Sequence, residues 1–219
     1  MKVVILAGGR GTRLGGDQPK PMVEIGGIPM LSHIIKVFQK HGYNDFVIAT
    51  GYKGSVISDY YEHDLSFDCL DTGLDTNTGE RVAQCADYLK GEPFLLTYGD
   101  GLADININKL VDFHFKVGSA VTVTAVHPPA RFGQLVLSGH DVVAFNEKPE
   151  NQTEWINGGF FVVSGDFPRL KSWEFEILPY LAEHDDLTAY RHAGFWHCMD
   201  TQRDVDALNQ LWKDGAPWL

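Results

Sequence analysis

Short apolar runs alternate with helical patterns along the first half of the chain. The runs at 2–7, 45–50 and 94–98 are mostly apolar and are typical of buried strands. Between them, apolar residues recur at helical spacing within 31–38 and 82–89, and each of these patterns ends at a glycine. Strands that alternate with helices predict an α/β fold with a mostly parallel central sheet flanked by helices.

The pattern changes after Gly118. Three short β-rich runs follow, at 120–126, 134–137 and 142–145, and a Ser-Gly-His-Asp turn at 138–141 separates the last two. Apolar runs joined by such a turn are typical of a hairpin. These runs together predict a small antiparallel β lobe attached to the parallel sheet.

The end of the chain predicts a helix that packs back on the body. Thr201 is followed three residues later by Asp204, which forms a capping-box pattern, and apolar residues then recur at helical spacing up to Trp212. We find no internal repeat and no linker rich in Pro, Gly or Ser. The 219 residues are therefore expected to form a single domain, 1–219.

Composition excludes several classes of partner. The formal net charge of −11 argues against nucleic acid, whose phosphates are bound by Lys and Arg. The first sixteen residues nevertheless hold Lys2, Arg10 and Arg13 and no acidic residue, so this local positive charge favours a small anionic ligand. The absence of a long apolar run argues against a membrane-spanning segment.

Cysteine usage and the start of the chain bear on its compartment. Met1-Lys2 is followed by only five apolar residues, which is too short for the core of a signal peptide. The three cysteines are odd in number and form no CxxC pair, so neither a disulfide framework nor a zinc site is expected. A reducing cytoplasm fits these observations best.

A glycine-rich loop follows the first predicted strand. It reads Leu-Ala-Gly-Gly-Arg-Gly-Thr-Arg-Leu over residues 6–14. Glycines let backbone N–H groups approach phosphate oxygens, and a following helix would add its dipole. Leu14 stands where the dinucleotide fingerprint needs a glycine, and the GK[ST] ending of the triphosphate loop is missing. Lys20, between two prolines, adds a rigidly placed cation. A tight turn that uses glycine only for geometry is the alternative interpretation.

Two aspartates are candidate metal ligands. Asp100 follows the predicted strand 94–98 and lies between two glycines, at the strand end where ligands bind in open α/β sheets. A carboxylate there is suited to hold Mg²⁺ against a triphosphate. Asp200 follows an aromatic run and precedes the last helix. Each has a structural alternative, because Asp is common in turns and at helix N-caps.

Six motifs in order resemble the sugar-phosphate nucleotidyltransferases. They are the glycine-rich loop, Pro-Lys-Pro-Met, Tyr-Gly-Asp-Gly, Glu-Lys-Pro, Asn-Gly-Gly-Phe and Phe-Trp-x-x-Met-Asp-Thr. The resemblance runs from residue 1 to about Trp218 and is strongest to the cytidylyl branch. It implies a Rossmann-like nucleotidyltransferase fold and attack of an acceptor phosphate on the α-phosphorus of a nucleoside triphosphate, with Mg²⁺ as cofactor. The partners implied are CTP and a small phosphorylated acceptor such as a sugar 1-phosphate.

The resemblance also implies roles for individual residues. The nucleotide is expected to contact Leu6, Ala7, Gly8, Gly9, Gly11, Thr12, Arg13, Lys20, Gly99 and Asp100. The acceptor is expected to contact Arg131, Gly133, Glu147, Lys148, Asn157 and Gly158. Mg²⁺ is expected to bind Asp100 and Asp200, and the catalytic group is expected to comprise Arg13, Lys20, Asp100, Lys148 and Asp200.

The choice of base depends on a second segment. Thr72, Gly73 and Arg81 lie in sequence that resembles the part facing the base in the cytidylyl branch, which favours CTP over UTP or dTTP. An exposed Arg81 in the first turn of its helix, with the base contacted by backbone groups alone, is the alternative. Only residues 62–71 stand where cytidylyl members carry a long insertion, so acceptor identity and a homo-oligomeric state stay open.

Two other functions compete with this one. A non-catalytic nucleotide-binding subunit of the same fold would be favoured by loss of Asp100 or Lys20, and both are present. An NAD-type binding protein is opposed by the missing third glycine of the loop.

Overall fold

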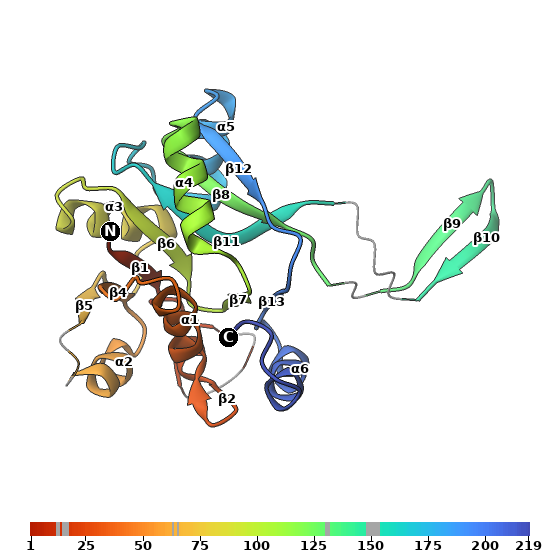
Figure 1. Ribbon diagram of the computed structural model, residues 1–219, viewed down its shortest axis with the longest axis horizontal. Helices are drawn as coiled ribbons and strands as arrows, with labels where there is room; N and C mark the ends of the chain where they lie inside the picture. Colours follow the sequence, from red (N-terminus) through yellow and green to blue (C-terminus); the bar gives the residue numbers. More distant parts are fainter. Residues whose placement is uncertain (12–13, 15–17, 63, 65, 130–131, 148–153) are drawn as a thin grey trace.

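The core of the protein is a seven-stranded sheet with helices on both faces (Figure 1). The computed structural model describes residues 1–11, 14, 18–62, 64, 66–129, 132–147 and 154–219. The main strands are β1 (Val3–Leu6), β4 (Phe46–Thr50), β5 (Phe67–Asp71), β6 (Phe94–Tyr98), β8 (Val121–Val126), β11 (Ile156–Val163) and β12 (Leu187–Arg191). The α-helices are α1 (Met30–Gln39), α2 (Gly54–Tyr61), α3 (Thr78–Tyr88), α4 (Ile107–Val117), α5 (Leu178–Glu183) and α6 (Gln202–Lys213).

The order of the strands confirms the predicted fold class. It is β12-β8-β11-β6-β1-β4-β5, and β1 pairs in parallel with both β4 and β6. β11 pairs antiparallel with β6 and β8, so it alone runs against the other strands of this sheet. The sheet is therefore mostly parallel, as the alternation of strands and helices predicts.

Alternate residues of each central strand pack into two different cores. Val3 and Ile5 of β1 face a cluster that includes apolar residues of α1, α4 and α6. Val4 and Leu6 face the opposite cluster, which includes residues of α3 and α5. A strand covered on both faces has no polar side, which is why these segments are continuous apolar runs in the sequence.

The predicted antiparallel lobe is a single hairpin, and one strand assigned to it belongs elsewhere. β9 (Gln134–Ser138) and β10 (Asp141–Asn146) pair with each other and extend away from the main sheet in Figure 1. The run at 120–126 instead forms β8 inside the main sheet, where it pairs with β11 and β12. Its sequence pattern does not show this placement, because both partners come much later in the chain. Apolar side chains of the hairpin are exposed: Leu135, Val136, Leu137, Val142, Val143 and Phe145.

Two further short pairings place residues of the site. β7 (Gly101–Ala103) follows the strand β6 directly in the chain and pairs antiparallel with β13 (Trp196–Cys198). β2 (Glu24–Ile25) and β3 (Ile28–Pro29) form a hairpin before α1. The expected order of strand, glycine loop and helix is observed, but the 3₁₀ turn η2 (Lys20–Met22) and this hairpin lie between the described part of the loop and α1, so α1 does not begin directly at the loop.

The last helix follows its sequence signals. Thr201 is the N-cap of α6, and Thr201 and Asp204 form the predicted capping box. The interpretation of Asp200 as the N-cap is thus wrong by one residue. Within the described part of the chain, no helix is long and apolar enough to cross a membrane.

Candidate functional site

A cleft of about 1230 Å³ opens at the carboxyl ends of β1 and β6. Ligands of open α/β sheets bind at this edge. Most of the predicted site residues line it, namely Leu6, Ala7, Gly8, Gly9, Gly11, Lys20, Arg81, Gly99, Asp100, Asn157, Gly158 and Asp200. Residues from six separate stretches of sequence are thereby brought to one cavity. Thr12, Arg13, Arg131 and Lys148 lie outside the described residues.

The glycines of the loop have different surroundings. A Cβ atom on Gly8 would lie 2.2 Å from Nη1 of Arg81, whereas one on Gly9 would meet no atom of the described residues within 4 Å. Gly11 has φ +56° and its Cα faces Lys20, where a Cβ would lie 2.8 Å from the Cβ of that lysine. Glycine is thus required for packing at residues 8 and 11, and at residue 9 it leaves the backbone open to a ligand.

Arg81 is buried, so the alternative of an exposed arginine is wrong. Its guanidinium donates hydrogen bonds to the carbonyl oxygens of Thr50 at 2.9 Å and Gly73 at 2.8 Å, and to the hydroxyl of Thr72. A longer contact of 3.3 Å reaches the carbonyl of Gly8. Burial lowers the pKa of Arg81, and the nearby Asp71 opposes this shift. The arginine therefore holds the glycine loop, the end of β4 and the 72–74 segment together, and also lines the cleft.

Lys20, Asp100 and Asp200 form the charged centre of the cleft. Nζ of Lys20 lies 2.6 Å from Oδ2 of Asp100 and 2.6 Å from Oδ1 of Asp200. Burial lowers the pKa of Lys20, but the charge and hydrogen bonds of the two aspartates outweigh burial and raise the pKa above its usual value. Lys20 therefore carries its full positive charge, and the three side chains are less than a third exposed.

The two aspartates are brought together by the β7–β13 pair. Gly101 pairs with Cys198 in that ladder, and the amide of Met199 donates to the backbone carbonyl of Asp100 at 2.8 Å. Asp204 fixes the other side, since its carboxylate accepts hydrogen bonds from the amide of Asp200 at 3.1 Å and from Thr201. The capping box of α6 thus also orients the second aspartate.

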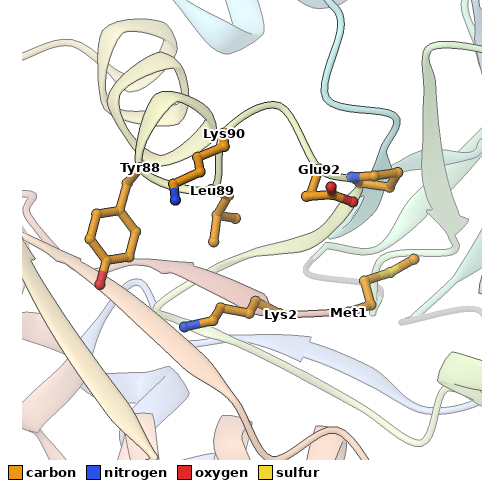
Figure 2. Close-up of a pocket in the computed structure, with 7 residues that line it drawn as sticks. Met1, Lys2, Tyr88, Leu89, Lys90 and Glu92 are labelled. Carbon is orange, nitrogen blue, oxygen red and sulfur yellow. The ribbon is translucent and has the colours of Figure 1, made fainter.

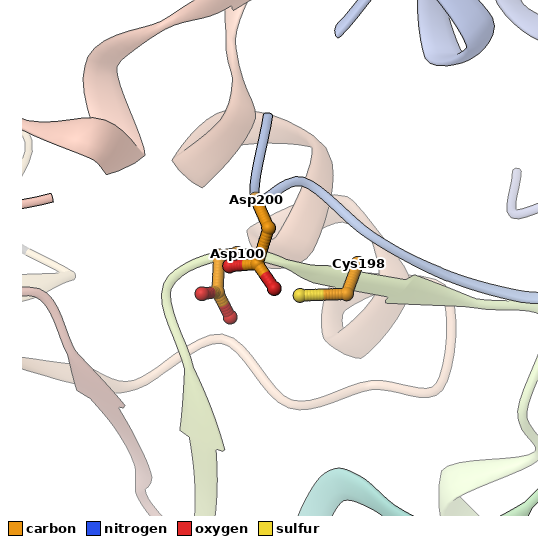
Figure 3. A group of neighbouring side chains, drawn as sticks. All are labelled: Asp100, Cys198 and Asp200. Atoms are coloured by element: carbon orange, nitrogen blue, oxygen red, sulfur yellow. The ribbon is translucent and has the colours of Figure 1, made fainter. Parts of the chain in front are cut away.

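The donor set at this centre fits a hard divalent cation. One ligand atom each from Asp100, Asp200 and Cys198 lies within 4.8 Å of the others (Figure 3). Burial, with the two carboxylates adding to it, raises the pKa of the Cys198 thiol, so this side chain is a neutral thiol. Mg²⁺ prefers carboxylate oxygens and does not use thiols. The residues that fit it are therefore Asp100 and Asp200.

A carboxylate that the sequence motifs do not identify also lines the cleft. Glu174 belongs to η3 (Trp173–Ile177), a π-helical turn, and accepts hydrogen bonds from the hydroxyls of Tyr98 at 2.8 Å and Thr78 at 2.6 Å. Burial raises the pKa of Tyr98, and the charge of Glu174 adds to this shift, so the phenol stays protonated. Glu174 lies in no motif of the resemblance, and only its spatial partners identify it.

The residues expected to contact the acceptor are described in part. The indole N–H of Trp196 donates to the carbonyl of Gly158 at 2.8 Å, and the side chain of Asn157 accepts from the amide of Gly159 at 2.8 Å. Gly133 and Glu147 lie beside each other at the base of the β9–β10 hairpin, where a Cβ on Gly133 would be 2.9 Å from Oε2 of Glu147. These two residues are not among those that line the cleft.

A second, smaller hollow lies at the other end of the sheet. It measures about 410 Å³ and is lined by the residues of Figure 2 around Lys2 and Tyr88. Lys2 is paired there with Asp68 at 2.9 Å. This hollow adjoins the amino end of β1 and contains none of the predicted site residues, so the larger cleft is the candidate active site.

Comparison with known proteins supports this assignment. The family model for nucleotidyl transferases matches residues 2–197. The glucose-1-phosphate cytidylyltransferase of Salmonella typhi is 44% identical, with 100% of this chain and 98% of that protein covered. A probable glucose-1-phosphate cytidylyltransferase of Bacillus subtilis is 39% identical, with 98% and 97% covered.

A solved structure shows the same fold. The crystal structure of a putative glucose-1-phosphate thymidylyltransferase from Bacillus anthracis, in complex with a sucrose, superimposes with a TM-score of 0.73. It is 22% identical and covers 97% of this chain, with 95% of that chain covered in turn. At this identity the likeness concerns the arrangement of sheet and helices alone.

Proposed function

This chain belongs to the nucleotidyl transferase family, and from that premise we propose that it transfers the CMP group of CTP to a sugar 1-phosphate. The observation that carries the proposal is the full-length identity of 44% to a glucose-1-phosphate cytidylyltransferase. Glucose 1-phosphate is therefore the first acceptor to test. The products would be a CDP-sugar and pyrophosphate.

The proposed reaction is an in-line displacement at phosphorus. An oxygen of the acceptor phosphate attacks the α-phosphorus of CTP, a new P–O bond forms, and the bond to the leaving pyrophosphate breaks. A phosphate monoester has its second pKa near ~6, so the acceptor is already largely dianionic at neutral pH and needs no general base. Catalysis then consists of positioning two anions and neutralising their charge.

The residues of the cleft are suited to these tasks. The open backbone at Gly9 would let N–H groups approach the triphosphate. Lys20 is charged and held by two carboxylates, so it is a preorganised cation for the phosphates. We assign Arg13 to the triphosphate as well, and Lys148 to the acceptor phosphate, from the family resemblance.

Asp100 and Asp200 are the residues that would hold Mg²⁺. Their carboxylate oxygens are hard ligands and approach a common cation, the ammonium of Lys20, at 2.6 Å each. Bound there, the metal would neutralise the charge of the triphosphate. Without it, the two carboxylates and the phosphates of CTP would repel one another.

The base is proposed to lie beside the 74–78 segment and Arg81. Several donors of the guanidinium already bind backbone carbonyls, so Arg81 acts on the base mainly through the segment that it orders.

Free cysteines at 69, 85 and 198 are those of a protein from a reducing compartment, and we place the enzyme in the cytoplasm.

One screen tests the function. Each of CTP, UTP, dTTP, GTP and ATP is incubated with Mg²⁺ and a panel of sugar 1-phosphates, and pyrophosphate release is measured. We expect release with CTP and glucose 1-phosphate. Release only with UTP or dTTP would overturn the cytidylyl assignment but not the reaction class, and no release with any pair would favour a non-catalytic nucleotide-binding subunit.

A further inference from the structure

Glu174 connects two walls of the cleft that are far apart in the sequence. Its Oε1 accepts a hydrogen bond from the phenolic hydroxyl of Tyr98, 76 positions away. Its Oε2 accepts a hydrogen bond from the hydroxyl of Thr78, 96 positions away. Both carboxylate oxygens are thus used, one on each side. Glu174 is partly buried and lines the cleft between these two partners.

The two hydroxyls belong to different halves of the site. Thr78 is the first residue of α3 and the last residue of the 74–78 segment, beside which the base is proposed to lie. Tyr98 is the last residue of β6, two residues before Asp100, and its hydroxyl also accepts a longer hydrogen bond of 3.4 Å from Asn157. Glu174 therefore spans from the nucleotide side to the acceptor side.

The turn that carries Glu174 is held rigidly. Trp173 is fully buried and packs edge-to-face on Phe161 and Phe167. Ser172 caps the turn by accepting from the amide of Phe175 at 3.1 Å. A π-helical turn held in this way is common near functional sites, and it fixes where the carboxylate points.

We infer that Glu174 is a positioning residue that sets the place of Tyr98, and through it of Asn157 on the acceptor side, relative to the nucleotide side. This inference rests on the proposed function. The nucleotide side, at the start of α3, depends less on Glu174 than Tyr98 does. The start of α3 is also fixed by the carbonyl of Lys171, which accepts from the amides at 79 and 80, whereas Tyr98 has Glu174 as its short hydrogen-bond partner. Loss of the carboxylate should therefore act mainly on the acceptor side.

Glu174→Gln is the test variant, because it keeps the shape of the side chain. Glutamine presents an NH2 group in place of one carboxylate oxygen, so one of the two hydroxyls would have to accept a hydrogen bond where it now donates one, and the negative charge is lost. We expect kcat to fall about tenfold and the acceptor KM to rise, since small misplacements at a reacting centre have effects of this size or larger. The Kd of CTP, measured by direct titration, should change less than about threefold.

Glu176→Gln is the matched control. Glu176 lies in the same turn, is exposed, and accepts only from the amide of Ser172 among its described hydrogen bonds. A merely structural role of the turn predicts that both variants lower the melting temperature and leave kcat and KM unchanged. The inference predicts a kinetic change in Glu174→Gln that is absent from Glu176→Gln.

A double-mutant cycle with Tyr98→Phe completes the test. If Glu174 acts through the phenolic hydroxyl, the double variant should lose no more acceptor kcat/KM than the stronger single variant. Independent, multiplying losses would overturn the inference, and so would unchanged kinetics of Glu174→Gln in an otherwise active enzyme. A wild-type protein that releases no pyrophosphate would instead overturn the proposed function on which the inference depends.

Discussion

Lys20 and Asp200 are 180 positions apart in the sequence, and the Nζ and Oδ1 atoms of these residues lie 2.6 Å apart in the cleft. The same ammonium contacts Asp100 at the same distance. The contact exists because β13 pairs with β7 immediately beyond β6, which brings the chain end to the carboxyl edge of the sheet. We expect the metal and the triphosphate of the proposed reaction to bind beside these two carboxylates.

The first prediction concerns the two aspartates. Asp100→Asn and Asp200→Asn should each lower turnover about 100-fold or more, because each removes one charge from the proposed metal site and one partner of Lys20. Pyrophosphate release with Mg²⁺ measures turnover, and circular dichroism checks the fold. Asp166→Asn, at an exposed residue outside the cleft, is the control. Near-normal activity of either cleft variant would remove that residue from the metal site.

The elements that could be predicted from the sequence are those with local signals. Thr201 and Asp204 form a capping box that needs only neighbouring residues, and the helix after it lies where the pattern indicates. The strand at 120–126 has an equally clear local pattern, but its sheet is decided by the distant partners β11 and β12. The sequence alone therefore identifies the strand and not its neighbours.

The candidate site divides in the same way. The glycine-rich loop and Lys20 follow from the chemistry of residues close together in the sequence. The pairing of Asp100 with Asp200 depends on the β7–β13 ladder, and only the family resemblance indicated it beforehand. Glu174 has neither a motif nor a neighbour in sequence that suggests its task, because its partners are 76 and 96 positions away.

The second prediction separates two adjacent glycines. Gly8→Ala should lower the free energy of unfolding by about 1–3 kcal/mol, because its Cβ would lie 2.2 Å from Nη1 of the buried Arg81. Gly9→Ala should change the stability by no more than about 0.5 kcal/mol, since its Cβ meets no described atom within 4 Å. Urea denaturation measures both.

Nucleotide binding provides the second half of this test. Gly9→Ala should still weaken CTP binding, because its methyl group would stand where the backbone is proposed to approach phosphate. Equal stability of the two alanine variants would contradict the packing of Arg81 on Gly8. Normal CTP affinity of Gly9→Ala would instead remove the backbone at residue 9 from the phosphate site.

The third prediction concerns the choice of nucleotide. A ligand at about a hundred times its Kd adds about 2.7 kcal/mol to the stability of the native state. CTP should therefore raise the melting temperature more than UTP or dTTP at equal concentration with Mg²⁺. Equal shifts for the three nucleotides would contradict the cytidylyl assignment and leave the reaction class intact.

The fourth prediction concerns Lys148, which lies outside the described residues. Its place in the Glu-Lys-Pro motif assigns it to the acceptor phosphate, so Lys148→Ala should raise the acceptor KM and lower kcat while CTP affinity stays nearly unchanged. Lys148→Arg keeps the charge and changes its geometry, so its activity measures how far geometry matters. A Lys148→Ala enzyme with weakened CTP binding and a normal acceptor KM would show that this lysine serves the other substrate.

The fifth prediction concerns His33, which is fully buried beneath the chain end. Its Nδ1 accepts the indole N–H of Trp218 at 3.2 Å, so the ring is the neutral tautomer that donates from Nε2 to the carbonyl of Ile25 at 2.8 Å. Burial lowers the pKa of His33 from its ordinary 6.5, and the bond to Ile25 opposes this only in part. Protonation of Nδ1 would place two N–H groups against each other.

The sign of the pH effect follows from these contacts. Between the lowered folded-state pKa and about 6.5, the unfolded chain binds more protons than the folded one, so the free energy of unfolding falls as the pH drops through this range. Burial also lowers the pKa of His114, which acts in the same direction. His33→Gln removes the titrating group, so its stability should decline less than that of the wild type between pH 7.5 and pH 5.5 in urea titrations. His33→Gln combined with His114→Gln should flatten the profile further. A wild-type profile no steeper than that of the double variant would show that His33 and His114 do not control the acid sensitivity of the fold.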